Sequence, residues 1–160
     1  MNKDEVYAFL LKCGVSFEVT EHKAVYNMKE MAEIELPHPE ADAKNLFIRD
    51  DKKRNYYLLT VKGDKKVDLK EFRKNQQTRA LSFASDEDLS KILGLIPGAV
   101  TPLGILNDDE CKVKVFIDEE LAGGLIGIHP NDNTATVWLQ TMDLVKIIRE
   151  HGNDVRIINM

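Results

Sequence analysis

Three glycines and two prolines interrupt the apolar segment at residues 93–108, and this interruption constrains the fold more than any other feature of the sequence. Glycine reaches backbone conformations that a Cβ forbids, whereas proline fixes φ and removes an amide donor. The stretch from Gly98 to Pro102 is therefore predicted to be a rigid turn with exposed amides that can hold a carbonyl or a phosphate. A tight connection between a helix and a strand is the alternative, because isolated glycine and proline residues commonly mark turns.

The length of 160 residues and the 43% hydrophobic content suit one compact domain over residues 1–160. Domains commonly contain ~100 to 150 residues, and a chain of this size buries most of its apolar surface. The N-terminal residues contain no uninterrupted apolar core, which argues against a signal peptide and a membrane span and predicts a cytoplasmic protein. Cys13 and Cys111 lie far apart without a CxxC pair, so we expect two buried apolar side chains, with neither a disulfide framework nor a metal site.

Charge is distributed unevenly along the chain. Residues 44–79 contain twelve Lys and Arg residues and five acidic residues, a local charge of +7, whereas the whole chain carries −5 and the remainder therefore −12. A basic segment on an acidic body attracts a polyanion to one face. A solvated lysine-rich hairpin that protects a sheet edge is the alternative.

Periodicity, caps and turn residues predict an α+β fold with a mixed, largely antiparallel central sheet of about seven strands flanked by helices. The alternation at residues 55–61 indicates a central strand, and that at residues 111–117 an antiparallel strand with one face in the core. Helices are expected at residues 4–13, 28–35, 68–74, 86–93 and 142–151. Strands are expected at residues 15–20, 45–49, 55–61, 80–83, 111–117, 125–128, 134–139 and 155–158.

Motifs of the familiar hydrolases and nucleotide-binding proteins are absent from the sequence. It contains no Walker loop, no GxGxxG after a strand, no HExxH and no GxSxG. We therefore expect no cofactor and no hydrolase of the kind that uses a protein nucleophile. His129 follows a glycine-containing apolar strand, where it is either a site residue or a structural histidine satisfied by the backbone.

Several stretches, taken together, carry a family resemblance. They are AKNLFIRD at residues 43–50, YYL at 56–58, KVDL at 66–69, the glycine- and proline-containing segment at 93–108, and HP with NTAT at 129–136. With these stretches in this order, nearly the whole chain resembles the YbaK family of aminoacyl-tRNA deacylases. The similarity is greatest to the free-standing Ala-tRNA(Pro) deacylases (ProXp-ala or PrdX), which are related to the editing insertion domain of bacterial prolyl-tRNA synthetase.

The resemblance implies a set of site residues. It places the essential lysine at Lys44, near the aminoacyl ester, with polar contacts from Asn45 and with His129 helping to determine which amino acid fits. It also implies that the GxxxP loop lines the pocket, with catalytic backbone amides at Gly98, Ala99, Val100 and Thr101 and with Pro102 among the substrate-binding residues.

The implied chemistry agrees with the absence of a nucleophile motif. An aminoacyl ester is already activated, so its hydrolysis needs a positioned water and a stabilised oxyanion more than a protein nucleophile. Lys44 would hold the terminal phosphate or the carbonyl, the loop amides would donate to the oxyanion, and the ribose hydroxyl of the substrate would assist with the proton. The expected reaction is the deacylation of mischarged Ala-tRNA(Pro).

Size explains why such a reaction is needed. The aminoacylation pocket of a synthetase that accepts proline rejects the smaller alanine only weakly, since a missing methylene is worth only ~1 to 3 kcal/mol. A second, smaller pocket that admits alanine and excludes proline solves this problem. Val25, Tyr26, Met28 and Met31 are candidates for its walls, with an ordinary core as the alternative. The residues expected to meet the phosphates of the acceptor stem are Lys65, Lys66, Lys70, Arg73, Lys74 and Arg79.

Specificity and turnover remain open at this point. The family often has an aromatic residue before the histidine and a hydrophobic residue after the proline, whereas this chain has Ile128 and Asn131–Asp132 there. One alternative is a deacylase that prefers Cys-tRNA(Pro) or has a broader specificity. Another is a non-catalytic module that binds tRNA or prolyl-tRNA synthetase. The expected partners are tRNA(Pro) and, secondarily, the synthetase, with no membrane partner.

Overall fold

The computed structural model describes all 160 residues and contains eight strands in two sheets, together with helices. The smaller sheet is antiparallel, with the order β1 (Phe17–Glu21), β7 (Ala135–Gln140) and β6 (Leu125–Ile128). The larger sheet has the order β4 (Leu81–Phe83), β2 (Ala43–Asp50), β3 (Tyr56–Lys62), β5 (Val113–Asp118) and β8 (Val155–Ile158). The mixed, largely antiparallel α+β class is confirmed, and its strands are divided between two sheets.

The middle of the larger sheet corrects one expectation. The position of β3 between β2 and β5 is central, as its pattern predicted. The prediction of an antiparallel strand at residues 111–117 is wrong, because β5 pairs parallel with β3 and with β8, Leu58 standing opposite Val115. Both faces of β5 are covered, with Val115 and Phe116 in different apolar clusters. Alternating polar residues therefore do not mark a solvent-facing side here.

Five α-helices surround the sheets, and their ranges are α1 (Lys3–Lys12), α2 (Met28–Ala32), α3 (Leu69–Gln76), α4 (Asp86–Asp88) and α5 (Thr141–His151). The helix expected at residues 86–93 is α4 followed by a π-helical segment, Leu89–Leu93, which ends at Gly94 with φ +64°. Short 3₁₀ helices occupy Pro39–Ala41, Pro102–Asn107 and Glu119–Leu121. None of the helices has the length and apolar character that crossing a membrane requires.

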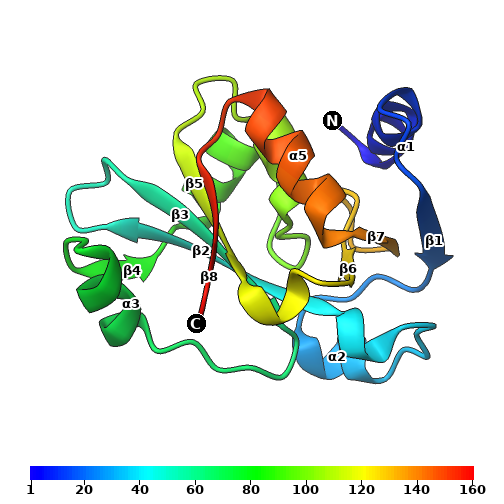
Figure 1. Cartoon of the computed structure of the whole chain (residues 1–160), viewed down its shortest axis with the longest axis horizontal. Coiled ribbons are helices and arrows are strands. Elements are labelled where there is room, and N and C mark those ends of the chain that lie inside the picture. Colours follow the sequence, from blue (N-terminus) through cyan, green and yellow to red (C-terminus); the bar gives the residue numbers. More distant parts are fainter.

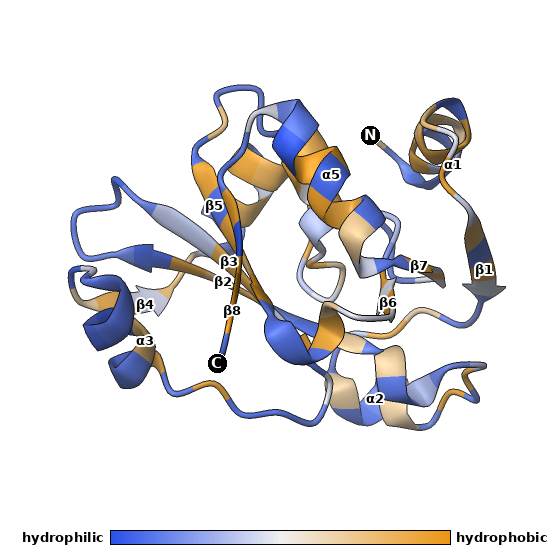
Figure 2. Ribbon diagram, viewed as in Figure 1, coloured by the Kyte–Doolittle hydropathy of each residue, from blue (hydrophilic) through white to orange (hydrophobic).

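The core consists of two apolar clusters on opposite faces of the larger sheet. The larger cluster packs α5 against β3, β5 and the smaller sheet, and the smaller cluster lies under α3 and includes Phe72 and Phe116. Figure 1 shows α5 and α3 at different sides of the strands, and Figure 2 shows that β3, β5 and β8 are apolar where they converge. The strands that bear the site are therefore anchored from both faces.

The cysteines differ from expectation. Cys13 is exposed and Cys111 is half-buried, and both are free thiols, so the prediction of two buried side chains is wrong. Cys13 caps the end of α1, whose buried side is formed by Val6 and Leu10 and leaves the cap in solvent. Cys111 has φ +52° in a turn before β5, with its Sγ 3.8 Å from Nδ1 of His151.

Candidate active site

A cavity of about 180 Å³ lies where the two sheets meet α2. Its walls come from segments far apart in sequence: the residues before and within α2, the start of β2, the loop at residues 98–100, and the end of β6 with the following histidine. A parallel bridge between Asp42 and Gly127 joins the sheets at this point, and Figure 1 shows α2 beside the start of β2. The site is thus built at the junction of the two sheets.

Lys44 reaches the cavity from β2, where it stands opposite Val61 of β3. Its Nζ donates a hydrogen bond to the carbonyl oxygen of Lys65 and forms no ion pair with a carboxylate. The side chain of Lys65 is itself held 2.5 Å from the fully buried Asp118. The Lys44 ammonium is therefore positioned without being neutralised, which leaves its charge available to an anionic or carbonyl oxygen.

Asn45 follows Lys44 and also lines the cavity. The hydroxyl of Thr60, on the neighbouring strand β3, donates to Asn45 Oδ1 at 2.6 Å. Since this bond occupies the amide oxygen, the amide nitrogen of Asn45 remains as a donor to a bound molecule.

The loop at residues 98–102 is divided between the cavity surface and the interior. Gly98 and Val100 line the cavity, and neither of their backbone N–H groups has a hydrogen-bond partner within the protein. Ala99 is 1% exposed, and its amide donates to the Ile96 carbonyl at 3.1 Å. The amides that can reach a substrate are thus those of Gly98 and Val100.

The other two loop residues lie behind this surface. Thr101 is fully buried, and its Oγ1 accepts a hydrogen bond from the Leu103 amide at 3.3 Å, which caps the 3₁₀ turn that Pro102 begins. The structure therefore brings Gly98 and Val100 to Lys44, whereas Ala99, Thr101 and Pro102 support the loop from inside.

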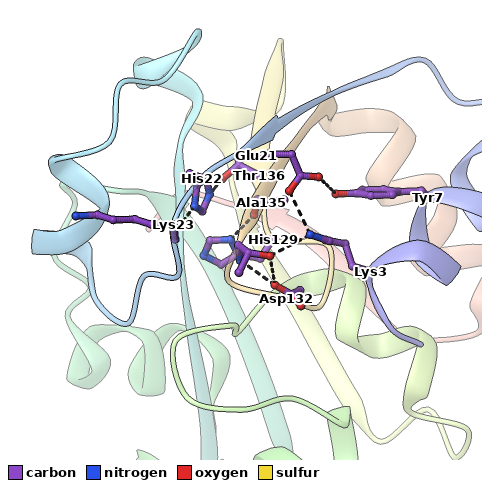
Figure 3. Close-up of polar contacts among 10 residues, drawn as sticks. Lys3, Tyr7, Glu21, His22, Lys23, His129, Asp132, Ala135 and Thr136 are labelled. Carbon is purple, nitrogen blue, oxygen red and sulfur yellow. Dashed lines mark hydrogen bonds and ion pairs between the residues drawn. The ribbon is translucent and has the colours of Figure 1, made fainter.

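His129 stands at the end of β6 with one edge in the cavity. Its Nδ1 donates to the Ala135 carbonyl at 2.8 Å, so the neutral ring presents Nε2 as an acceptor. Burial, and secondarily the nearby His22, lower the pKa of His129 below its ordinary value, so the ring is neutral at pH 7. Figure 3 shows the His22 ring beside it, with ring centroids 6.0 Å apart.

A polar network that sequence reasoning missed holds this histidine and its turn. His22 Nε2 lies 3.0 Å from Thr136 Oγ1, which fixes the second imidazole. The Asp132 carboxylate accepts hydrogen bonds from the Thr134 hydroxyl and, at 2.8 Å, from the Thr134 amide, and these bonds, chiefly the one from the hydroxyl, lower the pKa of Asp132. Lys3 of α1 also donates to Thr134 Oγ1 at 3.0 Å. The Asp-x-Thr pattern, an Asx-turn signal, was the available clue to this turn.

The residues expected to form the pocket walls differ in how far they are exposed to solvent. Val25 and Met31 line the cavity and are 2% and 4% exposed, and Met28 beside them is half-buried. Tyr26 also borders the cavity, but its side chain is 60% exposed. Val25 and Met31 are therefore walls, whereas Tyr26 stands at the mouth.

Asp42 is a cavity residue that sequence reasoning missed. Burial raises the pKa of its carboxyl to about 6, although a hydrogen bond with the Ala43 backbone acts in the opposite direction and lowers the pKa. No local sequence signal marks this residue, because its burial depends on the approach of α2 and β6.

The basic residues near α3 fall into two groups. Lys65 is paired with Asp118 and Glu120, and Arg79 is paired with Asp51. The members of the other group are exposed and form no ion pair, and they are Lys66, Lys70, Arg73 and Lys74. This second group is free to meet phosphates.

Comparison with known proteins agrees with this geometry. Residues 22–147 match the model of a family described as the aminoacyl-tRNA editing domain. The prolyl-tRNA editing protein ProX of Acetoanaerobium sticklandii is 40% identical over 159 residues, covering 99% of this chain and 97% of that protein. Prolyl-tRNA synthetase associated domain-containing protein 1 of Mus musculus is 34% identical, covering 91% of this chain and 89% of that protein.

Solved structures share the fold. One described as a candidate trans-editing enzyme for prolyl tRNA synthetase aligns with a TM-score of 0.72 at 22% identity, covering 99% of this chain and 96% of that chain. Because the family model spans most of the sequence and the bacterial relative aligns along nearly all of it, the resemblance carried by the KNLF and GxxxP stretches is confirmed. This chain belongs to the aminoacyl-tRNA editing domain family.

Proposed function

We propose that this protein is a trans-editing deacylase that hydrolyses mischarged Ala-tRNA(Pro). The family defines the enzyme class, aminoacyl-tRNA deacylase. One observation carries the rest of the proposal: an ammonium that no carboxylate neutralises, on Lys44, shares a small cavity with the unpaired amides of Gly98 and Val100. The cavity lining includes no serine, threonine or cysteine, which favours water as the nucleophile.

The reaction follows from this arrangement. Water attacks the ester carbonyl, the carbonyl oxygen becomes an oxyanion, and the bond to the ribose oxygen then breaks to release alanine and the tRNA hydroxyl. The amides of Gly98 and Val100 donate to the oxyanion, where one such donor is typically worth about 3 to 4 kcal/mol. Lys44 holds the carbonyl or the terminal phosphate, and the neighbouring ribose hydroxyl carries the proton to the leaving oxygen.

The character of the cavity wall supports the choice of amino acid. Val25 and Met31 form a buried apolar wall of the cavity, which suits a small apolar side chain such as that of alanine. Cysteine is the second candidate because it is also small. The name of the Acetoanaerobium relative refers to prolyl-tRNA, and we extend tRNA(Pro) to this chain as the carrier.

The decisive experiment compares esters of one tRNA. Alanyl, cysteinyl, seryl and prolyl esters of tRNA(Pro) are incubated with catalytic amounts of the protein, and multiple-turnover hydrolysis is measured. We expect fastest turnover of the alanyl ester and none of the prolyl ester. The Lys44→Ala variant should be inactive, while Lys12→Ala, which removes an exposed lysine of α1, should retain full activity.

The alternatives give different results. Preference for the cysteinyl ester would assign the protein to cysteine editing. Binding of charged tRNA without any turnover would instead indicate a module that docks tRNA or prolyl-tRNA synthetase, and full activity of Lys44→Ala would move the site elsewhere.

A further inference from the structure

The carboxyl group of Asp42 is a feature that the proposed reaction does not yet use. Both main-chain polar groups of Asp42 are hydrogen-bonded, since its amide donates to the Pro39 carbonyl at 3.4 Å and its carbonyl accepts from the Gly63 amide at 2.9 Å. Its carboxyl forms no ion pair, and its one polar contact within the protein is a hydrogen bond with the Ala43 backbone, which offsets only part of the effect of burial. A largely buried carboxyl group is thus left without a counter-charge.

Such a group is costly to the fold. A carboxylate removed from water is stabilised only by a partner, and where none exists its proton is held more tightly. Burial raises the pKa of Asp42 to about 6, so at neutral pH the ionised form predominates at the expense of stability. An unpaired charge that is retained in a cavity points to a role in binding.

No cation of the protein pairs with the Asp42 carboxylate. Of the groups that line the cavity, Lys44 forms no ion pair with Asp42, and His129 is neutral because burial lowers its pKa. The adjoining hollow, of about 640 Å³, is also lined by Asp42 and adds two lysines, Lys29 and Lys62, and two acidic residues, Glu40 and Asp64. Neither lysine forms an ion pair with Asp42. Asp42 is also the only carboxylate among the residues that line the cavity.

An aminoacyl ester supplies the matching cation. Its α-ammonium group is bonded to the carbon next to the scissile carbonyl, so a carbonyl placed at the Gly98 and Val100 amides brings the ammonium into the same small cavity. A neutral His129 does not repel it. We propose that the carboxylate of Asp42 binds the α-ammonium group of the substrate, an inference that rests on the proposed deacylase function.

This contact orients the substrate as well as holding it. With the ammonium fixed at Asp42 and the carbonyl fixed at the loop amides, the directions of two bonds of the α-carbon, those to the nitrogen and to the carbonyl carbon, are set. The side chain of the esterified amino acid then points either toward the wall formed by Val25 and Met31 or toward the solvent, and only a small side chain fits against that wall. Asp42 thereby makes the protein selective for esters with a free α-amino group.

The test replaces the ammonium by a neutral group of the same size. Alanyl-tRNA(Pro) and lactyl-tRNA(Pro), in which a hydroxyl stands for the amine, are hydrolysed by the wild type, by Asp42→Asn and by Asp64→Asn, the last removing an exposed carboxylate of the adjoining hollow. For Asp42→Asn we expect kcat/KM on the alanyl ester to fall about 10- to 100-fold, as for the loss of a charged hydrogen bond. Its rate on the lactyl ester should stay within about twofold of the wild type, and Asp64→Asn should match the wild type on both esters.

Other outcomes overturn the inference. An equal loss on both esters would make Asp42 a structural or general site residue, and no loss on either would leave the carboxylate without a role in binding. A changed ratio of seryl to alanyl hydrolysis, with an unchanged alanyl preference over lactyl, would show that Asp42 contacts the amino-acid side chain. Failure of the wild type to hydrolyse either ester would instead refute the proposed function itself. Should Asp42→Asn fold poorly, the wild type alone decides: it must prefer alanyl over lactyl, and equal rates on the two esters exclude the contact.

Discussion

A Cβ placed on Gly98 would lie 2.9 Å from the Cα of Tyr26, closer than side chains approach a backbone in folded proteins. Gly98 also has φ +87°, a conformation that residues with a Cβ rarely adopt. The loop and the residues before α2 are therefore in contact only because residue 98 is glycine, and this contact sets the width of the cavity at its amide side.

Replacing Gly98 by valine should displace the unpaired amides while leaving the α3 surface unchanged. We expect turnover of Ala-tRNA(Pro) to fall at least about 100-fold, as when an oxyanion donor is lost, with tRNA affinity within a few-fold of the wild type. Single-turnover rates and filter binding measure the two quantities. Gly123→Val is the matched control, because nothing lies within 4 Å of a Cβ there. Loss of the fold in Gly98→Val alone would assign this glycine a structural role.

The fold was predictable where local signals and tertiary packing agree. The helix start expected at residue 28 and the helix end expected at residue 151 coincide with the start of α2 and the end of α5, which Asn27 and Gly152 cap, since caps act within one turn. The parallel pairing of β5 was not predictable, because a parallel partner comes from a distant segment and leaves no mark on the strand itself. Position 111 was misjudged for a related reason: the turn before β5 places Cys111 at φ +52° and keeps it half-exposed.

The site was predictable only in part. The residues of one motif, Lys44 and Asn45, reach the cavity because they are adjacent on one strand end. The loop motif does not tell which amides are free, because this depends on the turn that uses the Ala99 amide. His22 and Asp42 were missed, since each acquires its surroundings from elements distant in sequence.

Lys65 was expected to contact tRNA, and the structure predicts a structural role for it instead. Its ammonium lies 2.5 Å from Asp118, which is fully buried, so Lys65→Ala would leave a buried carboxylate without its partner. Breaking such a pair typically costs about 3 to 5 kcal/mol, and the partial exposure of Lys65 favours the lower end. We expect a lower midpoint of urea unfolding together with displacement of the carbonyl that holds Lys44. Unchanged stability with weakened tRNA binding would restore the original expectation.

The four unpaired cations beside α3 should determine the salt dependence of tRNA binding. Each neutralised phosphate contributes roughly 0.7 to 0.9 to the slope of log affinity against log salt concentration. Lys70→Ala combined with Lys74→Ala should therefore reduce the slope by about 1.4 to 1.8 if both contact phosphates. Hydrolysis at saturating tRNA should remain unchanged. Arg79→Ala serves as the comparison, because Arg79 is already paired with Asp51, and an identical slope for all variants would place the acceptor stem elsewhere.

The Asp42 carboxyl should make the protein less stable as the pH rises from 4 to 6. Its pKa is about 6 in the folded protein and 3.8 in the unfolded chain, so the folded state binds more protons in this window and loses stability as they dissociate. The difference of about two pKa units corresponds to ~3 kcal/mol as an upper bound. The Asp42→Asn variant lacks this loss, so its unfolding free energy relative to the wild type should increase between pH 4 and pH 7. Urea titrations at the two pH values measure the difference. If the charge is retained for binding, Asp42→Asn should be more stable than the wild type at pH 7 and should also lose alanyl-ester hydrolysis. Equal pH dependence of stability in the two proteins would mean that water solvates the Asp42 carboxylate in the folded state.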